Sequence, residues 1–139
     1  MINSNPKLKL KLKRSRIIAE AVSRPDFQKQ HPKYSFEYLD GAYCITKCET
    51  EVRAEVITTL HKIAKLTWQE LQQLNRKRGG FENLPVDSLK CKIPEYFENY
   101  EKAVVFHNPG KKAIIGFREE ENYFIIAIDR NFKAYNHGK

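Results

Sequence analysis

Short runs of apolar residues, separated by turn residues, characterise the last third of the chain. The runs cover residues 103–106, 113–117 and 123–128. Each run is too short for a helix and is rich in Val, Ile, Phe and Tyr, which strands favour. Between the runs lie Asn108-Pro109-Gly110 and the charged segment 119–122, and such breaks are typical of tight connections. The pattern predicts three antiparallel strands in a meander.

A different spacing marks the middle of the chain, where apolar residues recur every three or four positions. Between residues 50 and 66 they form one face of a predicted helix, made by Val52, Val56, Leu60, Ile63 and Ala64. Thr50 is expected to cap this helix. Thr67 and Glu70 have the spacing of a capping box, which predicts the start of a second helix, and Gly79-Gly80 ends it. The two helices are expected to form a hairpin that packs its apolar face on the sheet.

Residues 34–47 have the pattern of a further hairpin. Two strand-like stretches flank Asp40-Gly41, which is a favoured turn between paired strands. The first stretch alternates three aromatic residues, Tyr34, Phe36 and Tyr38. These side chains either pack into the core or present a platform for stacked bases, and burial is the commoner role of such an alternation.

This order of elements predicts an α+β fold in which an antiparallel sheet, built from the N-terminal hairpin and the C-terminal meander, packs against the helical hairpin. Residues 34–139 form its single domain, with loops expected over residues 81–100. Residues 1–33 form a basic N-terminal arm that is partly disordered or helical. Within the arm, residues 7–13 alternate Lys and Leu, as in a strand with one apolar face, and residues 14–22 have helical character.

The arm also carries most of the net charge. The 139-residue chain has a formal net charge of +8. Nine of its 25 Lys and Arg residues, but only two of its 17 Asp and Glu residues, lie in the arm, so the rest of the chain is almost neutral. Such a cationic segment is attracted to polyanions, above all to nucleic acid. Alternatively, the arm is a solvated tail that keeps the protein soluble.

Composition also restricts the location and the cofactors. An odd number of cysteines, three, argues against a disulfide framework, and their spacing does not match a structural zinc site. No run approaches the roughly 20 apolar residues that a membrane-spanning helix requires, and the N-terminus does not read as a secretory signal. We therefore expect a soluble cytoplasmic protein without a metal or other cofactor.

Groups that bind phosphate or transfer protons surround the predicted meander. The candidates for catalysis are His107, Arg118, Arg130, Tyr135 and His137. Contacts with an RNA backbone are expected from six further cations, namely Lys111, Lys112, Lys133, Arg76, Lys77 and Arg78. The last three also fit the C-terminus of the second helix, where the helix dipole favours positive charge. That cluster therefore has a structural and a functional explanation.

The compact helical hairpin, the basic meander and the basic, aromatic C-terminal segment together resemble the RelE/ParE superfamily of toxin–antitoxin toxins. The resemblance covers mainly residues 50–137. The family's tail often ends in Arg followed by Tyr or His, which is similar to Arg130, Tyr135 and His137, whereas its usual central Arg would be replaced by a Lys or by Arg118. Many members are ribosome-dependent mRNA endonucleases. The resemblance therefore implies mRNA on the ribosome as the substrate and a cognate antitoxin protein as a partner.

Cleavage of RNA through its own 2′-hydroxyl needs a base for that proton, a cation for the charged phosphorane and an acid for the departing 5′-oxygen. His107 or His137 suits the base or the acid. Arg118 and Arg130 cannot lose their charge and suit the phosphate. Tyr135 can stack on a base or donate a proton. We expect these five side chains to converge on one edge of the sheet, because strand ends that are far apart in sequence can lie side by side.

Three functions of other classes also fit the sequence. The chain is either a nucleic-acid-binding module that acts through its basic arm, a toxin of the same fold that inhibits a protein target by docking, or a phage or plasmid protein that forms a complex with a host factor. A fold alone does not separate these functions from catalysis. Substitutions in the meander would affect the enzyme most, and removal of the arm would affect the binding module most.

Overall fold

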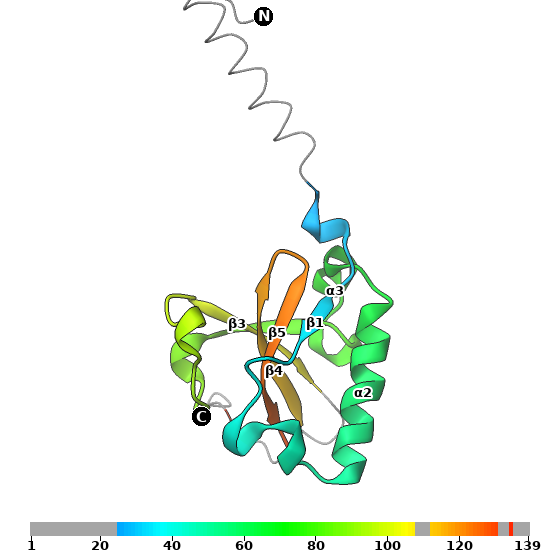
Figure 1. Cartoon of the computed structure of the whole chain (residues 1–139). Coiled ribbons are helices and arrows are strands. Elements are labelled where there is room, and N and C mark those ends of the chain that lie inside the picture. The colour runs from blue at the N-terminus through cyan, green and yellow to red at the C-terminus, as the bar shows by residue number, and fades with distance from the viewer. Residues whose placement is uncertain (1–24, 108–111, 131–133, 135–139) are drawn as a thin grey trace, which may run out of the picture.

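Figure 1 shows the computed structural model of the chain, which describes residues 25–107, 112–130 and 134. Within these residues the main elements are β1 (Lys33–Ser35), α2 (Thr50–Ala64), α3 (Trp68–Gln73), β2 (Phe81–Pro85), β3 (Lys102–His107), β4 (Ala113–Glu119) and β5 (Asn122–Asp129). The strands form one sheet in the order β1-β5-β4-β3-β2. The predicted α+β class is therefore confirmed. None of the helices in this part of the chain is long and apolar enough to cross a membrane.

The predicted C-terminal meander is also confirmed. β3 pairs with β4 and β4 with β5, in both cases antiparallel. Both faces of these strands are buried, with side chains alternating between a cluster under α2 and a second cluster on the opposite face. Two-sided burial explains why the sequence of each strand reads as a continuous apolar run rather than as an alternation.

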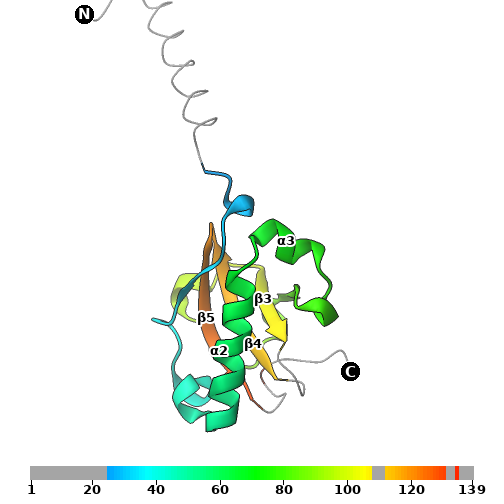
Figure 2. The same cartoon turned by 90° about the vertical axis from the view of Figure 1, so that its right-hand side faces the viewer.

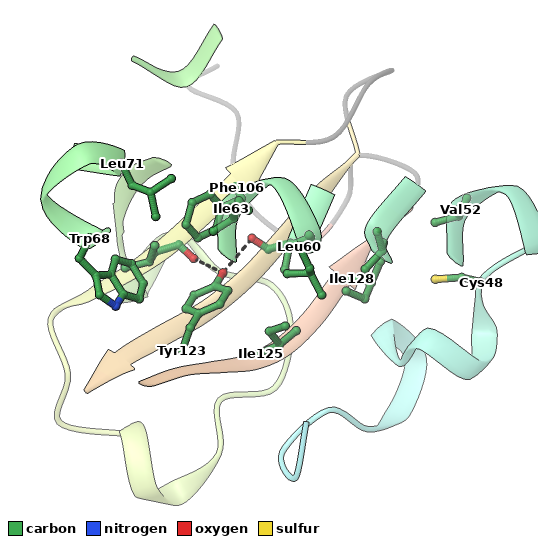
Figure 3. Packing of buried hydrophobic residues seen from close by; sticks show 13 residues of the cluster. Cys48, Val52, Leu60, Ile63, Trp68, Leu71, Phe106, Tyr123, Ile125 and Ile128 are labelled. Atoms are coloured by element: carbon green, nitrogen blue, oxygen red, sulfur yellow. Dashed lines mark hydrogen bonds between the residues drawn. The ribbon is translucent and has the colours of Figure 1, made fainter. Parts of the chain in front are cut away.

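Helix α2 covers one face of the sheet, as Figure 2 shows, where the helix lies in front of the strands. Its buried residues Val52, Val56, Leu60 and Ile63 are those of the predicted apolar face. Glu49, rather than Thr50, occupies the N-cap position of this helix. Figure 3 shows Leu60 and Ile63 of α2 in the same cluster as Tyr123, Ile125 and Ile128 of β5.

Helix α3 begins with the predicted capping box. The Thr67 hydroxyl accepts a hydrogen bond from the Glu70 amide at 3.2 Å, and the Glu70 carboxylate accepts one from the Thr67 amide at 3.0 Å. The helix ends at Gln73, several residues before the predicted Gly79-Gly80 stop. Arg76–Arg78 instead form a separate 3-10 turn, whose N-cap Asn75 accepts from the Arg78 amide at 3.0 Å. The dipole of α3 therefore does not explain this basic cluster.

The sheet is mixed, and the predicted antiparallel arrangement is wrong at the N-terminal hairpin. β1 is only three residues long and runs parallel to β5, with Lys33 opposite Asn122. The chain after it forms 3-10 turns at Gly41–Tyr43 and Ile45–Lys47. The Asp40 carboxylate accepts from the Gly41 amide at 2.8 Å and caps the first of these turns. The Asp-Gly pair therefore marks a capped 3-10 turn rather than the turn of a hairpin. Asp is favoured in both kinds of turn because its side chain forms hydrogen bonds with nearby backbone amides.

A strand occupies part of the predicted loop 81–100. β2 pairs antiparallel with β3 at the edge of the sheet, with Phe81 opposite Phe106. Pro85 stands at the end of this strand, which is a position that an edge strand tolerates. The remaining loop carries Phe97, which stacks on Phe117 with ring centroids 4.6 Å apart. This loop therefore closes the sheet face opposite α2.

The three aromatic residues of the predicted first hairpin are divided between different environments. Tyr34 packs against the cluster under α2, and its hydroxyl donates to the Leu60 carbonyl at 2.7 Å. Tyr38 packs on the opposite face, edge-on to Phe97 at 5.1 Å. Phe36 is 46% exposed. Because the strand ends at Ser35, the alternation does not place the three rings on one side.

Gly116 is a position in β4 where any side chain would collide with the neighbouring strand. A Cβ atom there would contact the Phe124 carbonyl oxygen and lie 2.8 Å from the Tyr123 ring. We expect Gly116→Ala to destabilise the protein by about 3 kcal/mol, because the obstacle includes backbone that cannot move aside freely. Gly41→Ala is the matched control. Gly41 has a positive φ of 71° but open space around it, so its substitution should cost only about 1–2 kcal/mol. Urea unfolding measures both, and equal losses would contradict the packing argument.

Candidate functional site

The strand register brings several predicted site residues to one end of the sheet. His107 of β3 lies opposite Ala113 of β4, and Ala113 lies opposite Asp129 of β5. Lys112 precedes Ala113 and Arg130 follows Asp129, so both cations belong to the same sheet end as His107. The predicted candidates Lys111, Lys133, Tyr135 and His137 belong to this part of the sequence but lie outside the described residues.

His107 forms a close pair with a carboxylate that sequence reasoning missed. Its Nε2 atom lies 2.6 Å from Oε1 of Glu82 on the neighbouring strand β2. The His107 side chain is only 10% exposed and that of Glu82 is 29% exposed. Burial restricts the imidazole to one orientation, and the carboxylate stabilises the imidazolium that forms when the ring accepts a proton. This is the relation between base and orienting group that general acid–base sites use.

Lys112 and Arg130 lie at this sheet end with partners from other elements. The Lys112 ammonium group is 3.0 Å from Oε2 of Glu55 on α2. The Arg130 guanidinium donates to the Ala42 carbonyl at 3.2 Å. Burial raises the pKa of Cys48, and the nearby charge of Arg130 acts in the opposite direction. Both cations therefore face the side of the sheet that carries α2, whereas His107 follows Val105 onto the opposite side.

The basic turn Arg76–Arg78 approaches the same sheet end. This turn precedes β2, and β2 starts opposite Phe106, one residue before His107. Lys77 and Arg78 are exposed. The turn thus adds two exposed cations at the sheet end of the His107–Glu82 pair, whereas Lys112 and Arg130 lie at this end on the side of α2.

Arg118 does not join this group, and the predicted convergence of all five catalytic candidates is wrong for it. Arg118 lies opposite Tyr123, next to the turn between β4 and β5 and therefore toward the other end of β4 from Ala113. Its guanidinium carbon is 4.3 Å from the centroid of the Trp68 ring, and its Nε donates to the Glu120 carbonyl at 2.8 Å. Burial lowers the pKa of Arg118. The residue acts as a structural cation between the sheet and α3, which is a common use of an arginine over an indole.

The described part of the chain has no group of three or more His, Cys, Asp or Glu residues placed to hold a metal ion. Its three cysteines are free thiols. Comparison of the chain with protein-family models, with curated proteins and with solved structures gives no match. The functional argument therefore depends on the residues at the sheet end themselves.

Proposed function

We propose that this protein is a toxin of a type II toxin–antitoxin system that cleaves mRNA on the ribosome by acid–base chemistry. The observation that carries the proposal is the His107–Glu82 pair, with 2.6 Å between Nε2 and Oε1, at a sheet end that also carries the exposed cations Lys77 and Arg78. RNA binding requires positive charge for the phosphates, and RNA cleavage requires a group that takes the proton of the 2′-hydroxyl. This sheet end offers both.

In the proposed reaction, RNA binding exposes Nδ1 of His107, which is buried in the free protein, while Nε2 faces Glu82. This Nδ1 atom accepts the proton of a ribose 2′-hydroxyl as the 2′-oxygen attacks the adjacent phosphorus. Glu82 stabilises the resulting imidazolium and keeps the ring in place. The bond from phosphorus to the 5′-oxygen then breaks, and that oxygen takes a proton from an acid, for which Tyr135 and His137 remain the sequence candidates. The products are a 2′,3′-cyclic phosphate and a 5′-hydroxyl.

Positive charge at the sheet end serves the phosphate in this proposal. Lys77 and Arg78 are exposed shortly before β2 begins, at the sheet end of the candidate base. Arg130 follows β5 at the same sheet end, on the side of α2. A cation that contacts the phosphorane more closely than the ground-state phosphate lowers the barrier. The cognate antitoxin would act by covering this surface.

A binding module without catalysis is the second candidate, and one observation favours it. Lys112 is already paired with Glu55, and Arg130 already donates to Ala42. If these contacts persist in the complex, both residues contribute general attraction to RNA but no close contact with the reacting phosphate.

Cleavage of a translated mRNA by the purified protein, with ribosomes present, separates the two candidates. The proposal predicts fragments that carry 2′,3′-cyclic phosphate ends, because the 2′-oxygen is the nucleophile. Binding to ribosomes or to mRNA with no new fragment ends would replace the nuclease by the binding module. Fragments with 3′-hydroxyl ends would contradict the proposed chemistry.

A further inference from the structure

A groove on the sheet face opposite α2 is not used by the proposed nuclease site. It has a volume of about 890 Å³ and lies between residues 37–43 and residues 90–98, with Ile126 of β5 among its lining residues. Figure 1 draws the first segment in cyan and the second in yellow-green. Ile93, Ala42 and Ile126 give this groove an apolar part.

Tyr96 forms a rigid aromatic surface at the groove. The ring is 54% exposed although it is held on several sides. It stacks on Tyr38 with centroids 6.0 Å apart, and it contacts Phe97 edge-on at 4.9 Å. Its hydroxyl donates to the Glu119 carboxylate at 2.8 Å. An exposed ring that is already fixed loses little conformational freedom on binding, and its electron-rich face attracts cations.

The groove is acidic although the protein is basic. Four carboxylates line it, from Glu37, Asp40, Glu95 and Glu98, against the two ammonium groups of Lys90 and Lys92. Among the described residues no ion pair engages these four carboxylates. Arg130 donates to the Ala42 carbonyl at one wall of the groove. A surface of this charge repels RNA and attracts a cationic segment.

We propose that the groove binds residues 7–16 of the chain's own N-terminal arm. Residues 7–13 alternate Lys with Leu, so the leucines can meet the apolar part of the groove while the lysines meet the carboxylates and the face of Tyr96. The eight residues 17–24 connect this segment to Pro25, and a chain of that length spans up to about 27 Å when extended. The longest strand of the domain also has eight residues and spans about the same distance. The arm is therefore long enough to reach the groove of the same molecule.

Zero-length carbodiimide crosslinking of the full chain tests this docking, because it joins only ammonium and carboxylate groups that are in contact. The proposal predicts amide links from the lysines of residues 7–13 to Glu37, Asp40, Glu95 or Glu98. The double variant Glu95→Lys and Glu98→Lys should lower their yield about tenfold, since two attractions become repulsions. The double variant Glu49→Lys and Asp87→Lys removes the same charge at exposed positions outside the groove and should leave the yield unchanged.

Arm crosslinks spread over exposed carboxylates in general, including Glu49 and Asp87, would overturn the proposal. A mixture of ordinary and nitrogen-15-labelled chains identifies the donor molecule: links within one isotope support docking in the same chain, and links between isotopes overturn it in favour of a second copy. Replacement of Lys7, Lys9, Lys11 and Lys13 by Gln gives the background from arm-independent links while leaving the groove unaltered. The crosslinking experiment does not depend on RNA cleavage. A result that contradicts the docking proposal is therefore distinct from one that contradicts the proposed nuclease function.

Discussion

Replacement of His107 by glutamine should lower the rate of RNA cleavage by about 10²- to 10⁴-fold, the usual contribution of a general acid or base. Glutamine retains a polar side chain that can hydrogen-bond to Glu82, but it cannot accept the proton of the 2′-hydroxyl. The effect should fall on the chemical step, so binding of the protein to ribosomes should remain close to that of the wild type. Single-turnover cleavage rates at saturating protein measure this step directly.

His61→Gln is the matched control for this substitution. His61 is exposed on α2 and belongs to a different part of the molecule. Its replacement should leave cleavage unchanged. Equal activity of wild type, His107→Gln and His61→Gln would remove His107 from the mechanism. A loss of cleavage that accompanies a loss of folded protein would show a structural role, so thermal unfolding of each variant belongs to the same experiment.

Replacement of Trp68 by alanine should destabilise the fold by about 3–5 kcal/mol. The indole is fully buried and contacts the rings of Phe81, Phe106 and Tyr123. Its Nε1 donates to the Glu121 carbonyl at 2.9 Å, and it carries the stacked guanidinium of Arg118. The substitution leaves a cavity, removes one of the two hydrogen bonds that the Glu121 carbonyl accepts, and leaves an arginine without its aromatic partner. Chemical unfolding monitored by far-ultraviolet circular dichroism measures the loss.

Ile57→Ala provides the comparison for Trp68→Ala. Ile57 is also a large apolar residue in the helical layer, but it is 63% exposed. Its replacement removes little buried surface, so we expect a change within about 0.5 kcal/mol. Similar losses for the two variants would mean that Trp68 does not join α3 to the sheet as described.

Elements with a strong local pattern were predicted well from the sequence. The face of α2 follows from residues three and four apart, and the capping box of α3 needs only Thr67 and Glu70, so both are visible without knowledge of the fold. The meander was predicted from its apolar runs and turns. In each case the information lies within a few consecutive residues.

Elements that depend on distant partners were missed. β1 has three residues and pairs with β5, about 90 residues further along the chain. β2 contains Glu82 and Asn83 and is ordered by its pairing with β3. In neither β1 nor β2 is the strand pattern of the sequence stronger than the turn pattern of the flanking residues.

The same limit applies to the candidate site. His107 was identified by its chemistry, but Glu82 becomes its partner only through the register of β2 and β3. The charge of Arg118 is visible in the sequence, whereas its position over Trp68 depends on a contact between β4 and α3. The missed carboxylate, Glu82, belongs to residues 81–85, which form β2. The one local sequence signal for this strand is the glycine pair that precedes it.

Sequencing of RNA 5′ ends after induced expression in a bacterium tests the central claim most directly. Wild type and His61→Gln should slow growth and produce new 5′-hydroxyl ends within translated reading frames, while His107→Gln should produce neither effect at equal protein level. Growth arrest by wild type and His107→Gln alike, with no new ends in translated messages, would contradict the claim that this protein cleaves mRNA through His107.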